Sequence, residues 1–175
     1  MRYRRDRAPG GCWFFTVNLA QRESGLLVTH VAHLRNVVRR VRQRHPFVIE
    51  AMVVLPDHLH AIWSLPEGDN DYAMRWGLIK AAFSKGVALQ EVRSASRVEK
   101  GERGIWQRRY WEHRIRDDRD FEHHVAYIHH NPVKHGHVAV AHDWPHSSIH
   151  QYLRQGIIHP DWAATPTIRN TDFGE

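Results

Sequence analysis

The sequence predicts an α+β protein in which helices pack on an antiparallel β-sheet. Three observations support this class. In several short segments, apolar residues alternate with polar ones or follow one another without a break, as they do in strands. In longer segments, apolar residues recur every three or four positions, as they do in helices. These segments follow one another in the order β-α-β-β-α-β-α. Such a mixed order suggests a sheet covered by helices.

The first strand is expected over residues 13–19 (WFFTVNL), which are aromatic and β-branched and follow a Pro-Gly-Gly turn. Thr29 is expected to cap a helix that runs to about Arg44 and ends before Pro46. Apolar residues recur along one face of this helix, and the other face carries arginines. Residues 47–55 are almost continuously apolar, which predicts a central strand buried on both faces.

A turn at Pro56 and Asp57 is expected to lead into the next strand. Residues 58–65 alternate: one face carries Leu59, Ala61, Trp63 and Leu65, and the other His58, His60, Ile62 and Ser64. A helix is expected over about residues 71–90, with an apolar stripe of Tyr72, Trp76, Ile79 and Phe83. The charged residues 91–104 predict a loop, and residues 111–116 a short strand.

The last predicted helix begins at Asp117 or Asp118, either of which can cap it. It is expected to end near Asn131, because Pro132 follows. Its apolar face carries Phe121, Val125 and Ile128.

The length of 175 residues predicts one domain over residues 1–175, with a basic N-terminal arm (about 1–10) and a C-terminal tail (about 137–175). Cys12 is the sole cysteine, which excludes an intramolecular disulfide and a thiolate zinc cluster. No run of about 18 apolar residues suggests a membrane span, and the basic start leads into APGG rather than an apolar signal segment. We therefore expect a cytoplasmic protein.

The net charge of +6 indicates a polyanionic partner, of which nucleic acid is the most probable. Seven tryptophans, several of them close to arginines, suit a surface that stacks on unpaired bases. The alternative is that most tryptophans lie in the core and most of the sixteen histidines on the surface.

Two short patterns carry candidate chemistry. His58 and His60 project from the same face of one strand and could bind one cation, although two exposed histidines would give the same pattern. Tyr127 and Asn131 lie four residues apart on one helix face, and His124 precedes Tyr127 by three. Tyr127 could be a nucleophile and Asn131 a further ligand, or Tyr127 could be a packing residue.

Long stretches resemble the REP-associated tyrosine transposases, which are relatives of single-strand insertion-sequence transposases with an HUH motif and one tyrosine. The matching stretches are PGGCWFFTVNL from Pro9, LPDHLHAIWSLPEGDNDYAMRWGLIKAAFS from Leu55, GERGIWQRRYWEHRIRDDRDFEHHVAYIHHNPVKHG from Gly101 and DWPHSSIHQYL from Asp143. They span nearly the whole chain in order, so the resemblance is specific.

The resemblance implies the ferredoxin-like HUH fold, with His58 and His60 as the HUH pair that binds a divalent metal, Mg²⁺ or Mn²⁺. Tyr127 matches the nucleophile, and Asn131 the helix position that supplies a further ligand. The implied substrate is single-stranded DNA of palindromic extragenic repeats folded into hairpins. The implied reaction is endonuclease cleavage and strand transfer through a 5′-phosphotyrosine, by a protein that is expected to be a monomer.

A tyrosine nucleophile needs help, because a free phenol has a pKa of about 10 and its full ionisation at pH 7 costs on the order of 4 kcal/mol. A nearby cation or general base must offset that cost, and His124 is a candidate proton acceptor. Candidate DNA contacts are Arg4, Arg5, Trp106, Arg108, Arg109, Arg114 and Lys134, each of which could instead be an ordinary surface or core residue.

Three other functions remain open at this point. The chain could bind repeat DNA without cutting it, or it could hydrolyse DNA with an activated water while Tyr127 is only structural. A replication or conjugation initiator would use the same HUH chemistry, but such proteins usually carry further domains.

Overall fold

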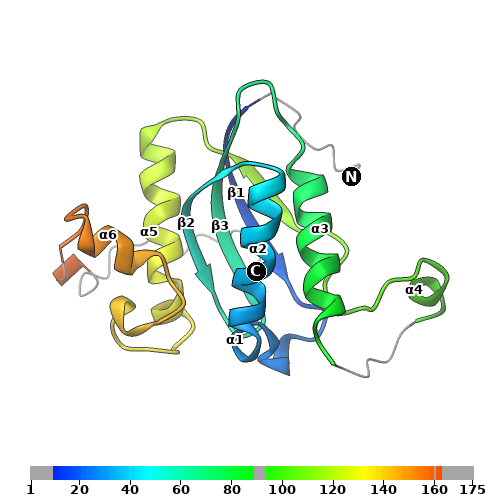
Figure 1. The fold of residues 1–175 in the computed structure, drawn as a ribbon. Helices are drawn as coiled ribbons and strands as arrows, with labels where there is room; N and C mark the ends of the chain where they lie inside the picture. Colours follow the sequence, from blue (N-terminus) through cyan, green and yellow to red (C-terminus); the bar gives the residue numbers. More distant parts are fainter. Residues whose placement is uncertain (1–9, 89–93, 160, 163–175) are drawn as a thin grey trace, which may run out of the picture.

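The computed structural model describes residues 10–88, 94–159 and 161–162 (Figure 1). The predicted N-terminal arm, with Arg4 and Arg5, lies outside them apart from Gly10. The sheet has the strand order β2-β3-β1-β4, with every neighbouring pair antiparallel. The strands are β1 Gly11–Asn18, β2 Val48–Val54, β3 His58–Leu65 and β4 Trp111–Arg114.

Helices cover both faces of this sheet, which confirms the predicted α+β class (Figure 1). Two long helices, α2 (Val31–Arg44) and α3 (Tyr72–Lys85), lie on one face, and α5 (Asp118–Lys134) lies on the other. The shorter helices are α1 Leu26–Thr29, α4 Ala95–Glu99 and α6 Ile149–Arg154, with single 3₁₀ turns η1 Arg22–Ser24 and η2 Ala141–Asp143. Within the described residues no helix has the length and apolar character that crossing a membrane requires.

The alternation predicted for β3 divides the core into two layers. Leu59, Ala61 and Trp63 pack under α2 and α3, where Trp63 stacks on Trp76 with ring centroids 4.1 Å apart. Ile62 packs with Phe14 under α5. The two histidines of β3 therefore lie in the layer beneath α5.

Several predicted boundaries and positions are wrong. β2 is an edge strand rather than a central one; its apolar run reflects helices on both of its faces, and Val48 is 49% exposed. Thr29 is the last residue of α1 rather than a cap, and its hydroxyl donates to the carbonyl of Gly25. α3 ends at Lys85, with Gly86 as its C-cap, rather than near residue 90, and the charged segment beyond it contains the short helix α4.

Helix α5, which carries Tyr127, begins as predicted, since Asp117 accepts a hydrogen bond from the Asp120 amide at 2.8 Å. It does not end at Asn131 but continues through Pro132 to Lys134. Proline lacks an amide hydrogen and so omits one helical hydrogen bond. The amide of His135 still donates to the Asn131 carbonyl at 3.1 Å. This extension keeps Lys134 on the helix that carries Tyr127.

Candidate active site

His58 and His60 form the centre of a buried polar cluster between β3 and α5. They are 1% and 0% exposed, and their ring centroids lie 4.9 Å apart. The alternative of two solvent-exposed histidines is therefore wrong. Buried polar side chains need partners, because removing them from water without one is costly.

Each imidazole is oriented by an oxygen at Nδ1. His58 Nδ1 donates to Asp57 Oδ1 at 2.7 Å, and His60 Nδ1 lies 2.9 Å from Thr16 Oγ1. When Nδ1 carries the proton, the lone pair of each ring lies on Nε2, which is the state a metal requires. β1 supplies Thr16 because Thr16 is paired with His60 in the sheet register.

Asp57 is itself held as an anion. Burial raises the pKa of its carboxyl. The hydrogen bond from His58 and the positive charge of Arg22 outweigh this effect and lower the pKa to about 2. Arg22 Nε pairs with the second carboxylate oxygen. Asp57 is therefore charged at neutral pH and would make His58 a stronger ligand for a metal bound at this site.

Tyr127 faces this histidine pair from α5. It is 2% exposed, and its ring centroid lies 5.2 Å from that of His60 and 6.1 Å from that of Phe14. Lys134 Nζ donates to the Tyr127 hydroxyl at 3.3 Å and sits 5.1 Å from the ring centroid. The hydroxyl thus has a cation beside it, seven residues further along the same helix.

The residues present fit a divalent cation. His58 Nε2 is buried and has no hydrogen-bond partner within the described part of the chain. Asn131, one helical turn beyond Tyr127, is fully buried and offers an amide oxygen. Two imidazole nitrogens and one amide oxygen form a neutral ligand set that suits Mn²⁺ and is compatible with Mg²⁺.

Replacing Asp57 with alanine should weaken metal binding by about 10- to 100-fold, because His58 would lose the acceptor that fixes its ring and tautomer. The metal concentration that gives half-maximal DNA cleavage measures this effect. Asp57→Asn keeps an oxygen acceptor and should lose less. If Asp57→Ala needs the same metal concentration for half-maximal cleavage as the wild type, Asp57 does not contribute to metal binding.

His124 belongs to a second polar group at the start of α5. One donor atom each from His113, Asp120 and His124 lie within 4.8 Å of one another. His113 Nε2 and Arg116 Nε donate to Asp120 Oδ2 at 2.9 and 3.0 Å, and His124 Nδ1 donates to the Asp120 carbonyl at 2.7 Å. Burial raises the pKa of the Asp120 carboxyl, but the hydrogen bonds from Arg116 and His113 bring it well below its usual range.

This group joins β4 to the first turns of α5, and Arg116 already balances the carboxylate charge. The His124 ring contacts His113 and Phe14, with centroids 4.8 Å away in each case. Phe14 in turn contacts Tyr127. His124 thus supports the Phe14 ring that packs on Tyr127, and its role as proton acceptor stays a prediction.

The predicted DNA contacts are scattered over the surface. Trp106 is 7% exposed and packs against Phe83, which leaves little ring surface for a base, and its stacking role stays a prediction. Arg108 pairs with Glu102 at 2.8 Å near α4. Arg109 and Arg114 are exposed. Lys134 is exposed and donates a hydrogen bond to the hydroxyl of the candidate nucleophile.

The sequence reasoning missed three contributors: Thr16, Asp57 and Phe14. Asp57 stands next to His58 in the sequence, so an acid beside a histidine pair was the available signal. Thr16 and Phe14 meet the site only through the pairing of β1 with β3, for which the local sequence gives no sign.

Comparisons with known proteins agree with this geometry. No protein-family model matches the chain. The chain is 46% identical to the REP-associated tyrosine transposase of Escherichia coli strain K12 over 165 residues, which cover 94% of this chain and 92% of that protein. It is 41% identical over 169 residues to a Haemophilus influenzae protein named as a member of the same family, covering 95% and 96% of the two chains.

A solved structure shows the same similarity in three dimensions. It is described as a REP-associated tyrosine transposase bound to a REP hairpin, and it matches with a TM-score of 0.85 and 43% identity. The match covers 100% of this chain and 97% of that one. Identity at this level over nearly the full length of both partners shows common family membership. The chain belongs to the family of REP-associated tyrosine transposases.

Proposed function

We propose that this transposase cuts and rejoins single-stranded DNA beside repeat hairpins, with Tyr127 as nucleophile and His58, His60 and Asn131 as ligands of a divalent metal. The observation that carries the proposal is the packing of the buried Tyr127 ring against His60, with ring centroids 5.2 Å apart. It brings a nucleophile and a metal-binding pair together from α5 and β3. The hairpin bound in the related structure supports the choice of substrate.

The tyrosine oxygen attacks phosphorus in line with the bond to the 3′ oxygen. A P–O bond to Tyr127 forms as the phenol releases its proton to solvent, the bond to the 3′ oxygen breaks, and that oxygen leaves and takes up a proton from solvent. The 5′-phosphotyrosine keeps the energy of the phosphodiester, so a DNA 3′-hydroxyl can later attack it and restore a continuous strand. The enzyme would act as both endonuclease and strand transferase.

The metal, Mg²⁺ or Mn²⁺, would polarise the scissile phosphate and relieve its negative charge when bound by His58, His60 and Asn131. The chain's own residues prepare the nucleophile. Lys134 holds the Tyr127 hydroxyl by a hydrogen bond and places positive charge where the phenolate develops. The walls formed by Phe14 and His60 fix the ring and exclude water from one side of it.

Replacing Lys134 with methionine should slow cleavage by about tenfold, which is less than the roughly 100- to 1,000-fold loss for a donor in a site closed to water, because Lys134 is exposed and solvent screens its charge. Single-turnover cleavage rates at saturating DNA measure the effect separately from binding. Lys134→Arg keeps the charge and should recover part of the rate. Equal rates for wild type and Lys134→Met would show that Lys134 serves only to bind DNA or not at all.

The proposed function is tested with end-labelled hairpin oligonucleotides that carry single-stranded flanks, incubated with the protein and manganese, magnesium or a chelator. We expect a cut in a flank that requires the metal and leaves a free 3′-hydroxyl. Cleavage without any protein–DNA adduct would favour a hydrolase that uses water. Tight binding without cleavage in either metal would point to a repeat-binding module.

A further inference from the structure

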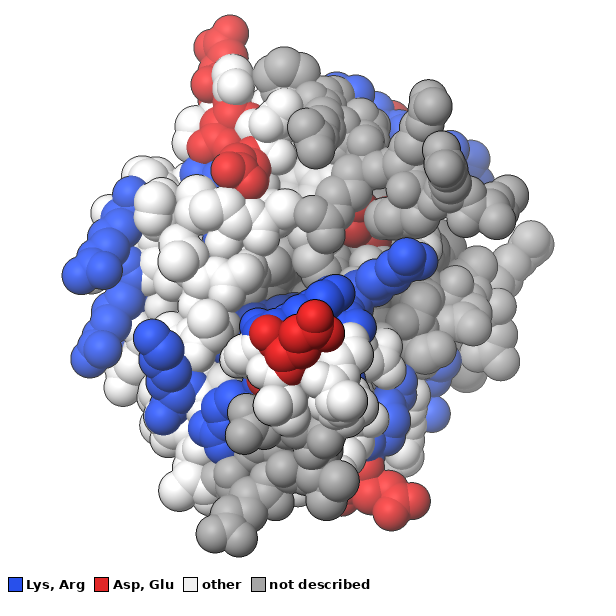
Figure 2. Space-filling view, turned by 90° about the vertical axis from the view of Figure 1, so that its right-hand side faces the viewer, with Lys and Arg blue, Asp and Glu red and all other residues white. Residues whose placement is uncertain are grey.

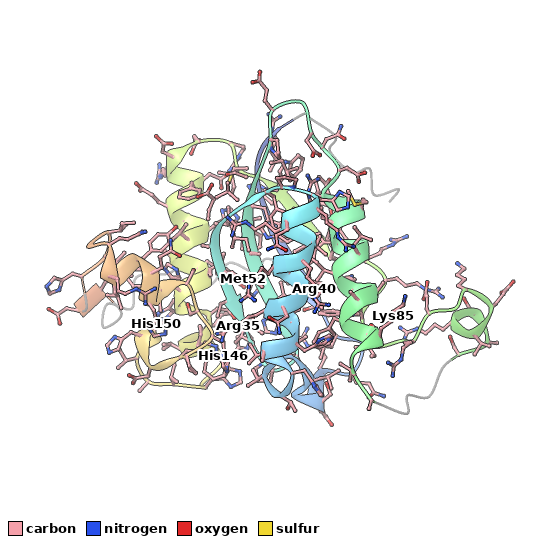
Figure 3. All side chains as sticks on the ribbon, viewed as in Figure 1. Arg35, Arg40, Met52, Lys85, His146 and His150 are labelled. Carbon is pink, nitrogen blue, oxygen red and sulfur yellow. The ribbon has the colours of Figure 1, made fainter. Side chains whose placement is uncertain are left out.

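A basic groove lies between α2 and the edge strand β2, away from Tyr127. It encloses about 360 Å³ and is closed on its third side by residues 146–148, which pair with β2. Val38, Ile49 and Met52 line it with apolar surface. Arg35, Met52 and His146 lie together on this side of α2 in Figure 3. The volume is at the lower end of the range for small-ligand pockets.

Three arginines, Arg35, Arg39 and Arg42, line the groove from one face of α2. Their spacing of four and three residues places them in one row. Within the described part of the chain no carboxylate pairs with any of them; their guanidinium groups contact backbone carbonyls, Asn36 and His146. Figure 2 shows lysine and arginine side chains gathered along its left edge, the side of α2. An anion with an apolar part fits this lining.

A line of aromatic rings connects the groove with the metal-binding pair. The His58 ring centroid lies 5.1 Å from that of His135, which lies 6.2 Å from His137. His137 stacks on Trp144 at 5.2 Å, and Trp144 lies 5.7 Å from His146. His146 Nδ1 is 3.5 Å from Arg35 in the groove. The candidate active site and the groove are thus the two ends of one ring track.

This ring track, His135–His137–Trp144–His146, is open to solvent along much of its length. His135 and His137 are exposed, and Trp144 is partly exposed and anchored by its indole nitrogen, which donates to the Val54 carbonyl at 2.9 Å. Burial lowers the pKa of His137 and of His146, and the charge of Arg35 lowers that of His146 further. The ring faces along the track offer stacking surfaces for bases.

We propose that single-stranded DNA next to the cleavage site runs over the ring track and places a nucleotide in the α2–β2 groove. Its phosphates would bind Arg35 and Arg39, and its base would lie on the apolar lining at Val38 and Met52. The inference rests on the proposed function, because it names the path of the DNA flank. A single strand is chosen over a duplex because only unstacked bases can lie on a row of rings and enter a groove.

The test measures binding to three probes: a blunt hairpin, the same hairpin with a single-stranded 5′ tail of about ten nucleotides, and the same hairpin with a 3′ tail of that length. All proteins carry Tyr127→Phe, so that binding is measured without cleavage. Arg35→Gln combined with Arg39→Gln is compared with Arg40→Gln combined with Arg44→Gln. The control pair removes the same charge from exposed positions on the same helix outside the groove, and Figure 3 places Arg40 on the side of α2 toward α3.

The groove variant should bind the tailed hairpin on the order of tenfold more weakly than the control variant. The plot of log affinity against log salt should also become less steep, by about 1.4, because two phosphate contacts are lost. Binding of the blunt hairpin should be the same for both variants. His137→Ala should also weaken binding of the tailed probe, by about fivefold, through lost stacking.

Equal binding of the tailed hairpin by the groove and control variants would overturn the proposal. So would an equal loss on the blunt hairpin, since the groove would then hold duplex DNA. Neither result depends on cleavage. Failure of the wild-type protein to form a covalent adduct would instead overturn the proposed function and leave the binding result standing.

Discussion

Tyr127→Phe should abolish strand cleavage and the covalent protein–DNA adduct, with a rate loss of at least about 10⁴-fold. The phenylalanine ring keeps the contacts with His60 and Phe14 but lacks the oxygen that attacks phosphorus. Because the hydroxyl is not needed to fill space, the variant should fold and bind hairpin DNA as the wild type does. Gel-based cleavage under single-turnover conditions measures the rate.

The control for this prediction is Tyr152→Phe. It removes a hydroxyl on α6 that donates a hydrogen bond to the Glu50 carbonyl of β2. It should cleave at close to the wild-type rate. Persistent cleavage by Tyr127→Phe, with Tyr152→Phe also active, would show that water or another residue is the nucleophile and that Tyr127 only packs.

His60→Ala should reduce cleavage by a factor on the order of 10³ or more, and His58→Ala should do the same. Each substitution removes one of the two imidazoles proposed to hold the metal, and the residual ligand set would bind it weakly. Calorimetric titration of Mn²⁺ into the protein measures this directly, with cleavage as a second measurement.

His142→Ala is the matched control for the two ligand variants, because His142 is partly exposed and its side chain lies 3.7 Å from the carboxylate of its neighbour Asp143. It should keep wild-type metal affinity. Because His58 and His60 are buried, the thermal stability of both variants must be measured alongside. Wild-type metal affinity in folded His58→Ala and His60→Ala would place the metal elsewhere, with the His113–Asp120–His124 group the first alternative to test.

A strand or long helix could be predicted from the sequence where one of its faces carries only apolar, buried residues. The alternation in residues 58–65 gave both the strand and the side on which the histidines lie, because leucine, alanine and tryptophan occupy one face without exception. β2 was misplaced for a physical reason. Helices bury both faces of this strand, and local sequence does not distinguish burial of the faces from pairing of the edges.

The site was predictable only in part. His58, His60, Tyr127 and Asn131 were named from spacing and resemblance, and the structure brings Tyr127 against the histidine pair. Lys134 was a candidate DNA contact, and it was placed just beyond the helix because Pro132 was expected to end that helix. The tertiary contacts of α5 override that local preference, so Lys134 remains in helical register and reaches the tyrosine hydroxyl.

The most direct test of the central claim is to identify the residue that becomes attached to DNA. The protein is incubated with a hairpin oligonucleotide and manganese, denatured and digested, and the DNA-linked peptide is sequenced by mass spectrometry. We predict one linkage, from Tyr127 to a 5′-phosphate, that is lost when the metal is chelated. A linkage to any other residue, or complete cleavage with no linkage at all, would contradict the account.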